Sequence, residues 1–268
     1  MRKASALAGL TVLLAVIIFP LYYAVAGSLM TEEELTRFPP ALFPSGLNWE
    51  NFASVLHVVP LARQYLNSIV VSLCVVAGVL LTSVLAGYAF TFLDFPFRRF
   101  AFGLFLSTMM IPAEASIIPN YLTMADWGLV NTFPALILPF LASGFGTFLM
   151  RQFFMTFPRE VYEAAKVEGC GHLRFLWSIL VPLSRPALGT LAVYSFIGTY
   201  NHYFWPLLVT NTPSMQTLQI GLAQLNSVEE RAPNLIMAGV VLAIIPMLVM
   251  IYAFQRHIVR GLTTGAVK

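Results

Sequence analysis

The chain has 268 residues, of which 58% are hydrophobic and 10% are charged, and its formal net charge is +3. Its mean hydropathy is +0.79. Soluble domains carry about 25% charged residues, so this composition excludes an ordinary soluble protein and predicts a protein of the lipid bilayer.

Six hydrophobic segments follow one another along the chain. A helix that spans a bilayer needs about 20 mostly apolar residues. The predicted spans are residues 6–29, 68–93, 100–118, 133–150, 187–209 and 234–255. No linker, low-complexity tail or internal repeat is evident. The sequence therefore predicts an all-α polytopic membrane protein with six transmembrane helices, whose single domain fills residues 1–268.

The first segment raises the alternative of a removable signal peptide. Arg2 and Lys3 precede its apolar run, and Ala24-Val25-Ala26 resembles a cleavage site. The run continues through bulky residues close to that site, including Phe19 and Tyr22. We therefore expect the segment to remain as a membrane anchor.

Residues 31–67 form the longest loop between the predicted spans. Proline-rich turns are followed by an amphipathic piece that carries Trp49, and tryptophan is enriched at membrane interfaces. We expect this piece to form a helix at the outer interface, where its role is anchoring.

Lysine and arginine are distributed unevenly between the two sets of loops. Membrane proteins carry an excess of these residues on the cytoplasmic side. One set of loops and termini holds 12 of the 15 cations: Arg2, Lys3, Arg98, Arg99, Arg151, Arg159, Lys166, Arg174, Arg185, Arg256, Arg260 and Lys268. The other set holds Arg37, Arg63 and Arg231. The sequence therefore predicts cytoplasmic termini and a cytoplasmic loop between the fourth and fifth spans.

Glu114 is the one clear acidic residue inside the predicted spans, and it lies between Pro112 and Pro119. These prolines break the third helix and free backbone groups, which a bilayer tolerates only beside protein or a water-filled cavity. Glu114 is a candidate for contact with a polar solute, although a salt bridge to a neighbouring subunit is equally reasonable. Asn120 and Tyr121, on the same broken segment, offer hydrogen bonding and ring stacking and are secondary candidates.

The loop of residues 157–186 is polar and helix-forming. Residues 159–168 combine an apolar side with a charged side. Gly169 can take a positive φ and end this helix, and a second short helix can run over residues 173–181 before Pro182. The pattern predicts a helical elbow suited to docking against another protein, although an ordinary amphipathic loop helix would show the same polarity.

The spacing of residues in this loop resembles the EAA loop of permease subunits of ATP-driven (ABC) importers. The positions that the resemblance implies for coupling to an ATPase are Glu163, Ala164, Ala165, Gly169 and Pro182, and Ile179 and Pro186 match as well. Val167-Glu168-Gly169-Cys170 stands where the family more often has Ile-Asp-Gly-Ala, a conservative departure. The resemblance implies a type I ABC importer permease fold with a cytoplasmic coupling helix between spans four and five.

The resemblance extends over nearly the whole chain and is closest to the smaller, six-helix permease of the carbohydrate-uptake class. Residues 254–268 are similar to the ending of that class. The segments that look most like the sn-glycerol-3-phosphate branch are Arg151-Gln152-Phe153-Phe154-Met155, Pro112-Ala113-Glu114 and Trp205-Pro206-Leu207-Leu208. The implied solute is therefore sn-glycerol-3-phosphate or a related glycerophosphodiester, with a disaccharide such as maltose or trehalose as the alternative.

The resemblance also implies the partners. These are a second homologous permease subunit, two cytoplasmic ATPase subunits and an external solute-binding protein, together with membrane lipid but no nucleic acid. The sequence has no GxxxxGK[ST] phosphate loop, so ATP and magnesium are expected on the ATPase subunits, with no cofactor or metal bound by this chain. We expect a non-catalytic subunit in the plasma (inner) membrane of a prokaryote.

A secondary transporter, driven by an ion gradient, is the alternative from a different class. Such a carrier would be expected to show ionisable residues inside the spans and two related halves. A membrane-embedded enzyme has less support, because the sequence has no HExxH and no GxSxG motif.

The fifth span carries the polar run Tyr200-Asn201-His202-Tyr203. Relatives often have Trp-Asn here, so Tyr200 replaces a tryptophan. Asn201 is the first candidate for the substrate path and Tyr203 joins it, although Asn201 and His202 would also suit hydrogen bonds between helices. A phosphate-bearing solute calls for arginine or lysine, and the predicted spans offer none, so those cations would have to come from a partner.

Overall fold

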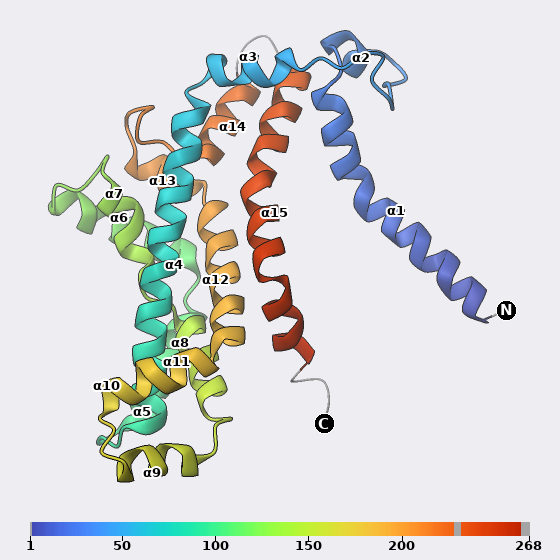
Figure 1. The fold of residues 1–268 in the computed structure, drawn as a ribbon. Coiled ribbons are helices and arrows are strands. Elements are labelled where there is room, and N and C mark those ends of the chain that lie inside the picture. Colours follow the sequence, from blue (N-terminus) through green and yellow to red (C-terminus); the bar gives the residue numbers. More distant parts are fainter. Residues whose placement is uncertain (1, 228–231, 264–268) are drawn as a thin grey trace.

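The computed structural model describes the backbone of residues 2–227 and 232–263 (Figure 1). It also describes the side chains in these ranges, except those of residues 2–5, 8, 227 and 256–263. Every regular element in the described ranges is a helix, as the composition predicts. The similarity of residues 254–268 to a family ending falls almost wholly outside the described side chains.

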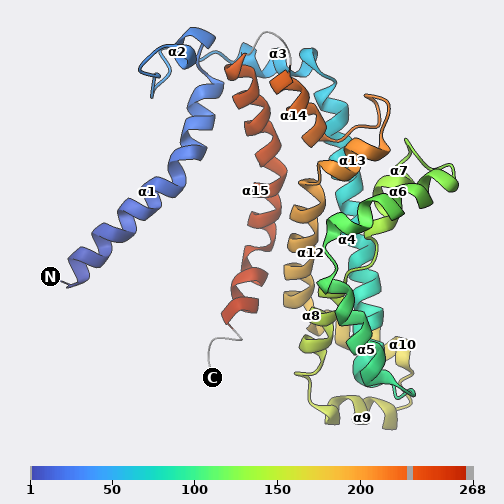
Figure 2. The same ribbon diagram turned by 180° about the vertical axis from the view of Figure 1, so that it is seen from behind.

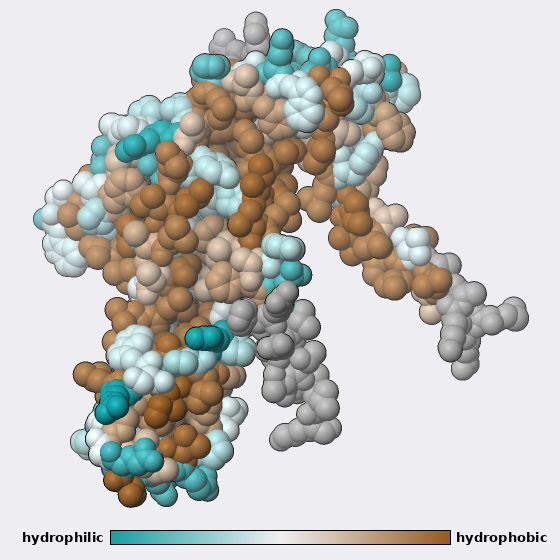
Figure 3. Space-filling model, in the orientation of Figure 1, coloured by the Kyte–Doolittle hydropathy of each residue, from teal (hydrophilic) through white to brown (hydrophobic). Residues whose placement is uncertain are grey.

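Three helices are long and apolar enough to cross a membrane by themselves, namely Gly9–Ser28, Leu61–Phe92 and Pro233–Gln255. Three further pairs of helices reach the necessary length only when the two members of each bent pair are counted together, which gives up to six spans. Hydrophobic residues cover the middle of the face shown in Figure 3, and hydrophilic residues gather toward its upper and lower ends. This distribution suits a protein with a bilayer around its middle.

The long helix α1 (Arg2–Ser28) lies along the outside of the molecule. It packs on α15 (Pro233–Thr263) near one end, and Figures 1 and 2 both show that the two helices diverge toward the other. Most side chains of α1 are exposed, from Leu7 at 66% to Val25 at 51%. This apolar surface requires lipid or another subunit around it.

The loop after α1 contains α2 (Glu32–Thr36) and α3 (Glu50–Val58). As predicted, α3 lies across the end of the bundle, directly after Trp49 (Figure 1). Its buried Asn51 donates to the carbonyls of Ser28 and Met30, both at 2.9 Å, and accepts from Asn234 at 2.9 Å. One amide therefore ties α3 to the end of α1 and the start of α15.

Helix α4 (Leu61–Phe92) begins seven residues before the predicted span of residues 68–93. The extra turns carry Gln64 and Asn67, which are buried. Asn67 donates to the carbonyls of Ser214 and Gln216 at 2.8 and 2.9 Å, and Gln64 Nε2 donates to Gln216 Oε1 at 3.2 Å. The polar start of the helix is stable because a distant loop supplies its partners.

The third and fourth predicted spans are each broken. The first pair, bent by 96°, consists of α5 (Arg98–Ser107) with the 3₁₀ turn Thr108–Met110, followed by the 3₁₀ turn Ala113–Ser116 with α6 (Ile117–Asp126). The second pair, bent by 45°, consists of α7 (Phe133–Ile137) with the 3₁₀ turn Leu138–Phe140, followed by α8 (Gly144–Phe154). Pro112 lies at the first break, as predicted, because proline cannot continue the hydrogen-bond ladder. The prediction that Pro119 also breaks the helix was wrong: Pro119 lies in the first turn of α6, where its missing N–H removes no helical bond.

The predicted fifth span, residues 187–209, is instead two helices, α12 (Arg185–Tyr200) and α13 (Phe204–Val209). The chain turns at residues 201–203, and Trp205 Nε1 on α13 donates to Ala135 O on α7 at 2.9 Å. This contact draws α13 away from the axis of α12. The helix α14 (Leu218–Ser227), which the sequence pattern does not predict, follows before α15.

Helices α4 and α8 approach each other closely at Gly87 on α4 and at Gly146 on α8, where an added Cβ atom would collide with Ser83 Oγ. A Cβ atom added to Gly87 would lie 3.0 Å from Met150 Cβ and 3.1 Å from the backbone nitrogen of Arg151. Lipid tails give no hydrophobic force between helices, so small residues that admit close van der Waals packing determine which helices associate.

We expect Gly87→Leu to force α4 and α8 apart and lower the free energy of unfolding by about 1–3 kcal/mol, the usual effect of overpacking. Gly103→Leu is the matched control, because nothing lies within 4 Å of a Cβ at Gly103. Thermal unfolding of the detergent-solubilised chain, followed by tryptophan fluorescence, measures both. Equal midpoints for the two variants would show that Gly87 is not a packing constraint.

Candidate functional site

The loop of residues 157–186 folds into an elbow at one end of the molecule, here called the α9 end (Figure 1). Its first arm is α9 (Arg159–Val167), which agrees with the predicted helix. Gly169 has φ +75°, and its N–H donates to Lys166 O at 3.0 Å, while Cys170 N donates to Ala165 O at 2.9 Å. Glycine adopts this left-handed conformation without the steric cost that a Cβ would bring.

The second arm runs through α10 (His172–Phe175), a π-helical turn (Leu176–Leu180) and α11 (Val181–Leu183). It extends beyond its predicted end at residue 181, because Pro182 lies at the start of α11, where its missing N–H removes no necessary bond. The arm meets α12 at an angle of 79°. Ser184, fully buried at this corner, donates from Oγ to Leu180 O at 2.7 Å.

An aromatic cluster attaches the elbow to the long helix α4. The ring of Tyr162 on α9 lies 5.0 Å from that of Phe92 on α4 and 5.1 Å from that of Phe175 on α10, measured between centroids. His172 Nδ1 lies 2.9 Å from the hydroxyl of Tyr88 and 3.3 Å from that of Tyr162. Both arms of the elbow are therefore packed against the end of α4.

The residues of the Glu-Ala-Ala motif lie on different sides of α9. Ala165 is buried at 7% exposure and packs into the core with Phe175 and Leu176. Glu163 and Ala164 are exposed, and we find no hydrogen bond or ion pair for Glu163 among the described residues. The arrangement anchors the helix through Ala165 and leaves the carboxylate and a small side chain on its outer surface.

The aromatic cluster was not predicted from the sequence. Tyr88 and Phe92 are four residues apart on α4, which places them on one face of the helix. They lie inside a long apolar run, however, so nothing in their local pattern separates them from residues that face lipid. Tyr162 was predicted only as part of the apolar side of α9.

Asn201, the first candidate for the substrate path, lies at the end of α12 and is exposed. Its Oδ1 accepts from Gln219 Nε2 on α14 at 3.2 Å. Tyr203 is half-buried with its ring 5.4 Å from that of Phe204, and His202 packs against the ring of Phe140 at 4.7 Å. The polar run therefore occupies the break between α12 and α13 instead of the middle of a continuous span.

The candidates from the third span follow the 96° bend. Glu114 is exposed on the 3₁₀ turn, without a hydrogen bond or ion pair among the described residues. Asn120 and Tyr121 are half-buried on α6, where Tyr121 packs against the same core as Met124 and Trp205. Helix α13, which follows Asn201 and Tyr203, contacts α6, which carries Asn120 and Tyr121. No hydrogen bond between the two sets of candidates occurs in the described residues.

Among the described side chains, no group of three or more His, Cys, Asp or Glu residues is placed to hold a metal ion.

A family model described as the binding-protein-dependent transport system inner membrane component matches residues 78–264. The sn-glycerol-3-phosphate transport system permease protein UgpE of Yersinia pestis is 37% identical over 255 residues, which cover 92% of this chain and 90% of the relative. The protein of the same name from Brucella abortus is 38% identical, with 97% of each chain covered. That from Agrobacterium fabrum is 38% identical, with 97% of this chain and 96% of the relative covered.

A solved structure gives the same fold. It is the crystal structure of a bacterial ABC transporter involved in the import of the acidic polysaccharide alginate, with a TM-score of 0.84, 25% sequence identity and coverage of 96% of each chain. The predicted permease fold is confirmed by this likeness together with the family match.

We expect Tyr162→Ala to loosen α9 from α4 and α10, because it removes two aromatic contacts worth about 0.5–1.5 kcal/mol each. Amide hydrogen exchange over residues 159–168 should then be about tenfold faster, with little change in α4 and α12. Val167→Ala is the control, since Val167 is 88% exposed on the same helix. Similar exchange in both variants would mean that the aromatic cluster does not hold the elbow.

Proposed function

We propose that this chain forms part of the membrane pathway for sn-glycerol-3-phosphate or a related glycerophosphodiester. The chain is an ABC importer permease subunit, because it belongs to the family of binding-protein-dependent transport system inner membrane components. The observation that carries the choice of solute is the identity of 37–38%, over more than nine-tenths of the chain, with relatives named for that solute. The family match also favours ATP-driven import over the alternative of a secondary transporter.

A disaccharide such as maltose or trehalose is the second candidate solute. The residues proposed for the path are neutral or acidic: Asn201, Tyr203, Glu114, Asn120 and Tyr121. Such groups suit sugar hydroxyls, whereas phosphate is recognised most strongly by arginine or lysine. For sn-glycerol-3-phosphate we therefore assign recognition of the phosphate to the partner permease subunit or the external solute-binding protein.

We propose an assembly of this chain with a second homologous permease subunit, two ATPase subunits and an extracytoplasmic solute-binding protein. In it, the ATPase subunits bind ATP and magnesium and catalyse hydrolysis, while this chain is non-catalytic. From the end of the molecule that carries α3, α1 and α15 both extend toward the side of the elbow, although α1 starts well short of the level of α9 (Figure 1). The excess of lysine and arginine in those segments supports a cytoplasmic location for the α9 end and for both termini.

The elbow is proposed to couple ATP binding to movement of the transmembrane helices. Glu163 and Ala164 are available on the outer surface of α9 for an ATPase subunit. A displacement of α9 would act on α4 through Tyr162 and Phe92, and on α12 through the buried corner at Ser184. Closure of the ATPase dimer would in this way rotate two spanning helices together and change the side from which the path opens.

We expect Glu163→Ala to weaken contact with the ATPase subunits, and Gly169→Leu to distort the elbow, because a left-handed residue with a Cβ costs about 1–2 kcal/mol. In proteoliposomes of the full complex, solute uptake per ATP hydrolysed should fall by about tenfold or more in each variant. Glu32→Ala, the same change in an exposed residue of α2 at the opposite end, should leave the ratio unchanged. Normal uptake ratios in both elbow variants would contradict the coupling role.

The solute is tested by ATPase activity of the complete complex with the solute-binding protein loaded in turn with sn-glycerol-3-phosphate, a glycerophosphodiester, maltose and trehalose. We expect stimulation by the phosphate-bearing solutes and not by the sugars. Stimulation only by a disaccharide would establish the second candidate, and activity independent of any loaded binding protein would refute import by this mechanism.

A further inference from the structure

A pocket rich in arginine lies at the α9 end, between the ends of α4 and α8, the start of α5 and the start of α9. Its charged walls are Arg98, Arg151 and Arg159, and its apolar walls include Phe92, Phe154 and Phe157. No acidic side chain is among the residues that line it, although Asp94 and Glu163 line an adjoining hollow that shares Arg98 and Arg159 with it. We call these residues the arginine pocket.

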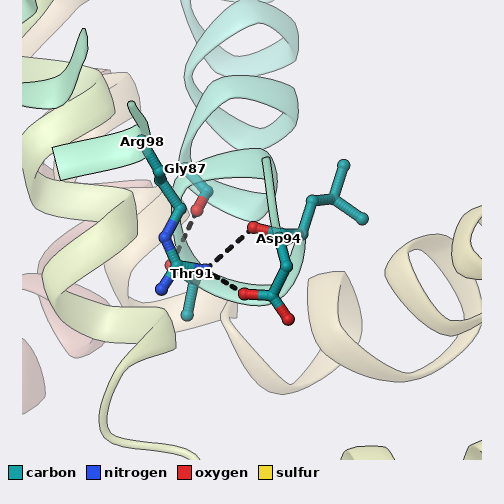
Figure 4. A network of polar contacts seen from close by, with 5 residues as sticks. Gly87, Thr91, Asp94 and Arg98 are labelled. Atoms are coloured by element: carbon teal, nitrogen blue, oxygen red, sulfur yellow. Dashed lines mark hydrogen bonds and ion pairs between the residues drawn. The ribbon is translucent and has the colours of Figure 1, made fainter. Parts of the chain in front are cut away.

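Only one of the three guanidinium groups has an acidic partner within the described residues. Arg98 Nη1 donates to Leu93 O at 2.8 Å and to Asp94 Oδ1 at 3.1 Å (Figure 4). The carboxylate of Asp94 is 97% exposed, so water screens this pair strongly. The figure shows both contacts formed on one side of the Arg98 guanidinium, at the end of α4.

Arg151 is held in place without a charged partner. Its guanidinium carbon lies 4.1 Å from the centroid of the Phe102 ring, and its Nε is buried with no hydrogen-bond partner. Arg159, exposed at the start of α9, likewise has no ion pair in the described part of the chain. The pocket therefore contains more positive charge and more N–H donors than the described protein groups satisfy.

The surface beside the arginine pocket exposes aromatic rings. Phe97, directly before α5, is 82% exposed, and Phe100, in the first turn of α5, is 71% exposed, next to Arg99. Phenylalanine on one side and arginine on the other are typical of amphipathic segments that lie in the membrane interface. A ligand of this site can thus place an anionic group among the arginines and hydrocarbon against the phenylalanines.

We propose that the arginine pocket binds the headgroup of an anionic phospholipid from the cytoplasmic leaflet. Its phosphate accepts hydrogen bonds from Arg151 and Arg159, with Arg98 completing the positive wall, and the adjoining acyl chains cover Phe97 and Phe100. Because the pocket joins α8 to α9, a bound lipid also links a transmembrane helix to the helix of the elbow.

Native mass spectrometry of the purified complex tests the site, with phosphatidylglycerol titrated against phosphatidylcholine. An arginine near the membrane surface changes affinity for anionic lipid about fivefold. We expect Arg159→Gln to weaken phosphatidylglycerol binding by about fivefold and Arg151→Gln/Arg159→Gln by about 25-fold. Phosphatidylcholine binding should stay the same in all variants. Inorganic phosphate alone, without acyl chains, should not displace the lipid at millimolar concentration.

Arg174→Gln is the matched control, because Arg174 is exposed on α10 at the same end but does not line the pocket, and it should bind lipid like the unsubstituted chain. Arg151→Lys keeps the charge and should retain most of the binding, which separates loss of the site from loss of folding. Equal phosphatidylglycerol binding in the double variant and in Arg174→Gln would overturn the proposal. So would cross-linking of residue 159 to an ATPase subunit with lipid binding unaffected, since the pocket would then be a protein contact.

Discussion

The close approach of α4 and α8 at Gly87 positions most of the remaining structure. It brings the end of α8, with Arg151, beside the end of α4, with Phe92, and the elbow packs against the latter. In a bilayer such an approach depends on van der Waals contact between small and large side chains, because the surrounding hydrocarbon is as apolar as the helices themselves. Gly87 on α4 and Gly146 on α8 therefore both set how closely the two helices can pack.

The two ends of α4 are held by different kinds of interaction. At the end near α3, buried Asn67 hydrogen-bonds the backbone of the loop before α14, which fixes a segment that contains a turn but no helix. At the α9 end, Tyr88 and Phe92 contact the elbow mainly through their rings.

The breaks in the helices provide free backbone polar groups for the proposed solute path. Backbone groups that leave a helix inside the membrane need protein or water beside them. The bend before Glu114 and the break at Asn201 leave such groups on segments that lead into α6 and α13, and these two helices contact each other. Gln219 partners Asn201, so the same residue that is a candidate for solute contact also fixes the position of α14. Family membership identifies a permease, but the solute depends on side chains that the partner subunits also supply.

The sequence alone determined the class of protein, the helical elbow with its glycine at φ +75°, the helix α3 after Trp49 and the proline break near Glu114, because each depends on local residue type and spacing. The tertiary structure decided what local pattern does not encode: the early start of α4, the separation of α13 from α12, and the aromatic cluster around Tyr162. In each case the feature depends on a hydrogen bond or a ring contact between residues more than 60 positions apart. An apolar run has the same composition whether it faces lipid or a neighbouring helix, so only packing can distinguish the two.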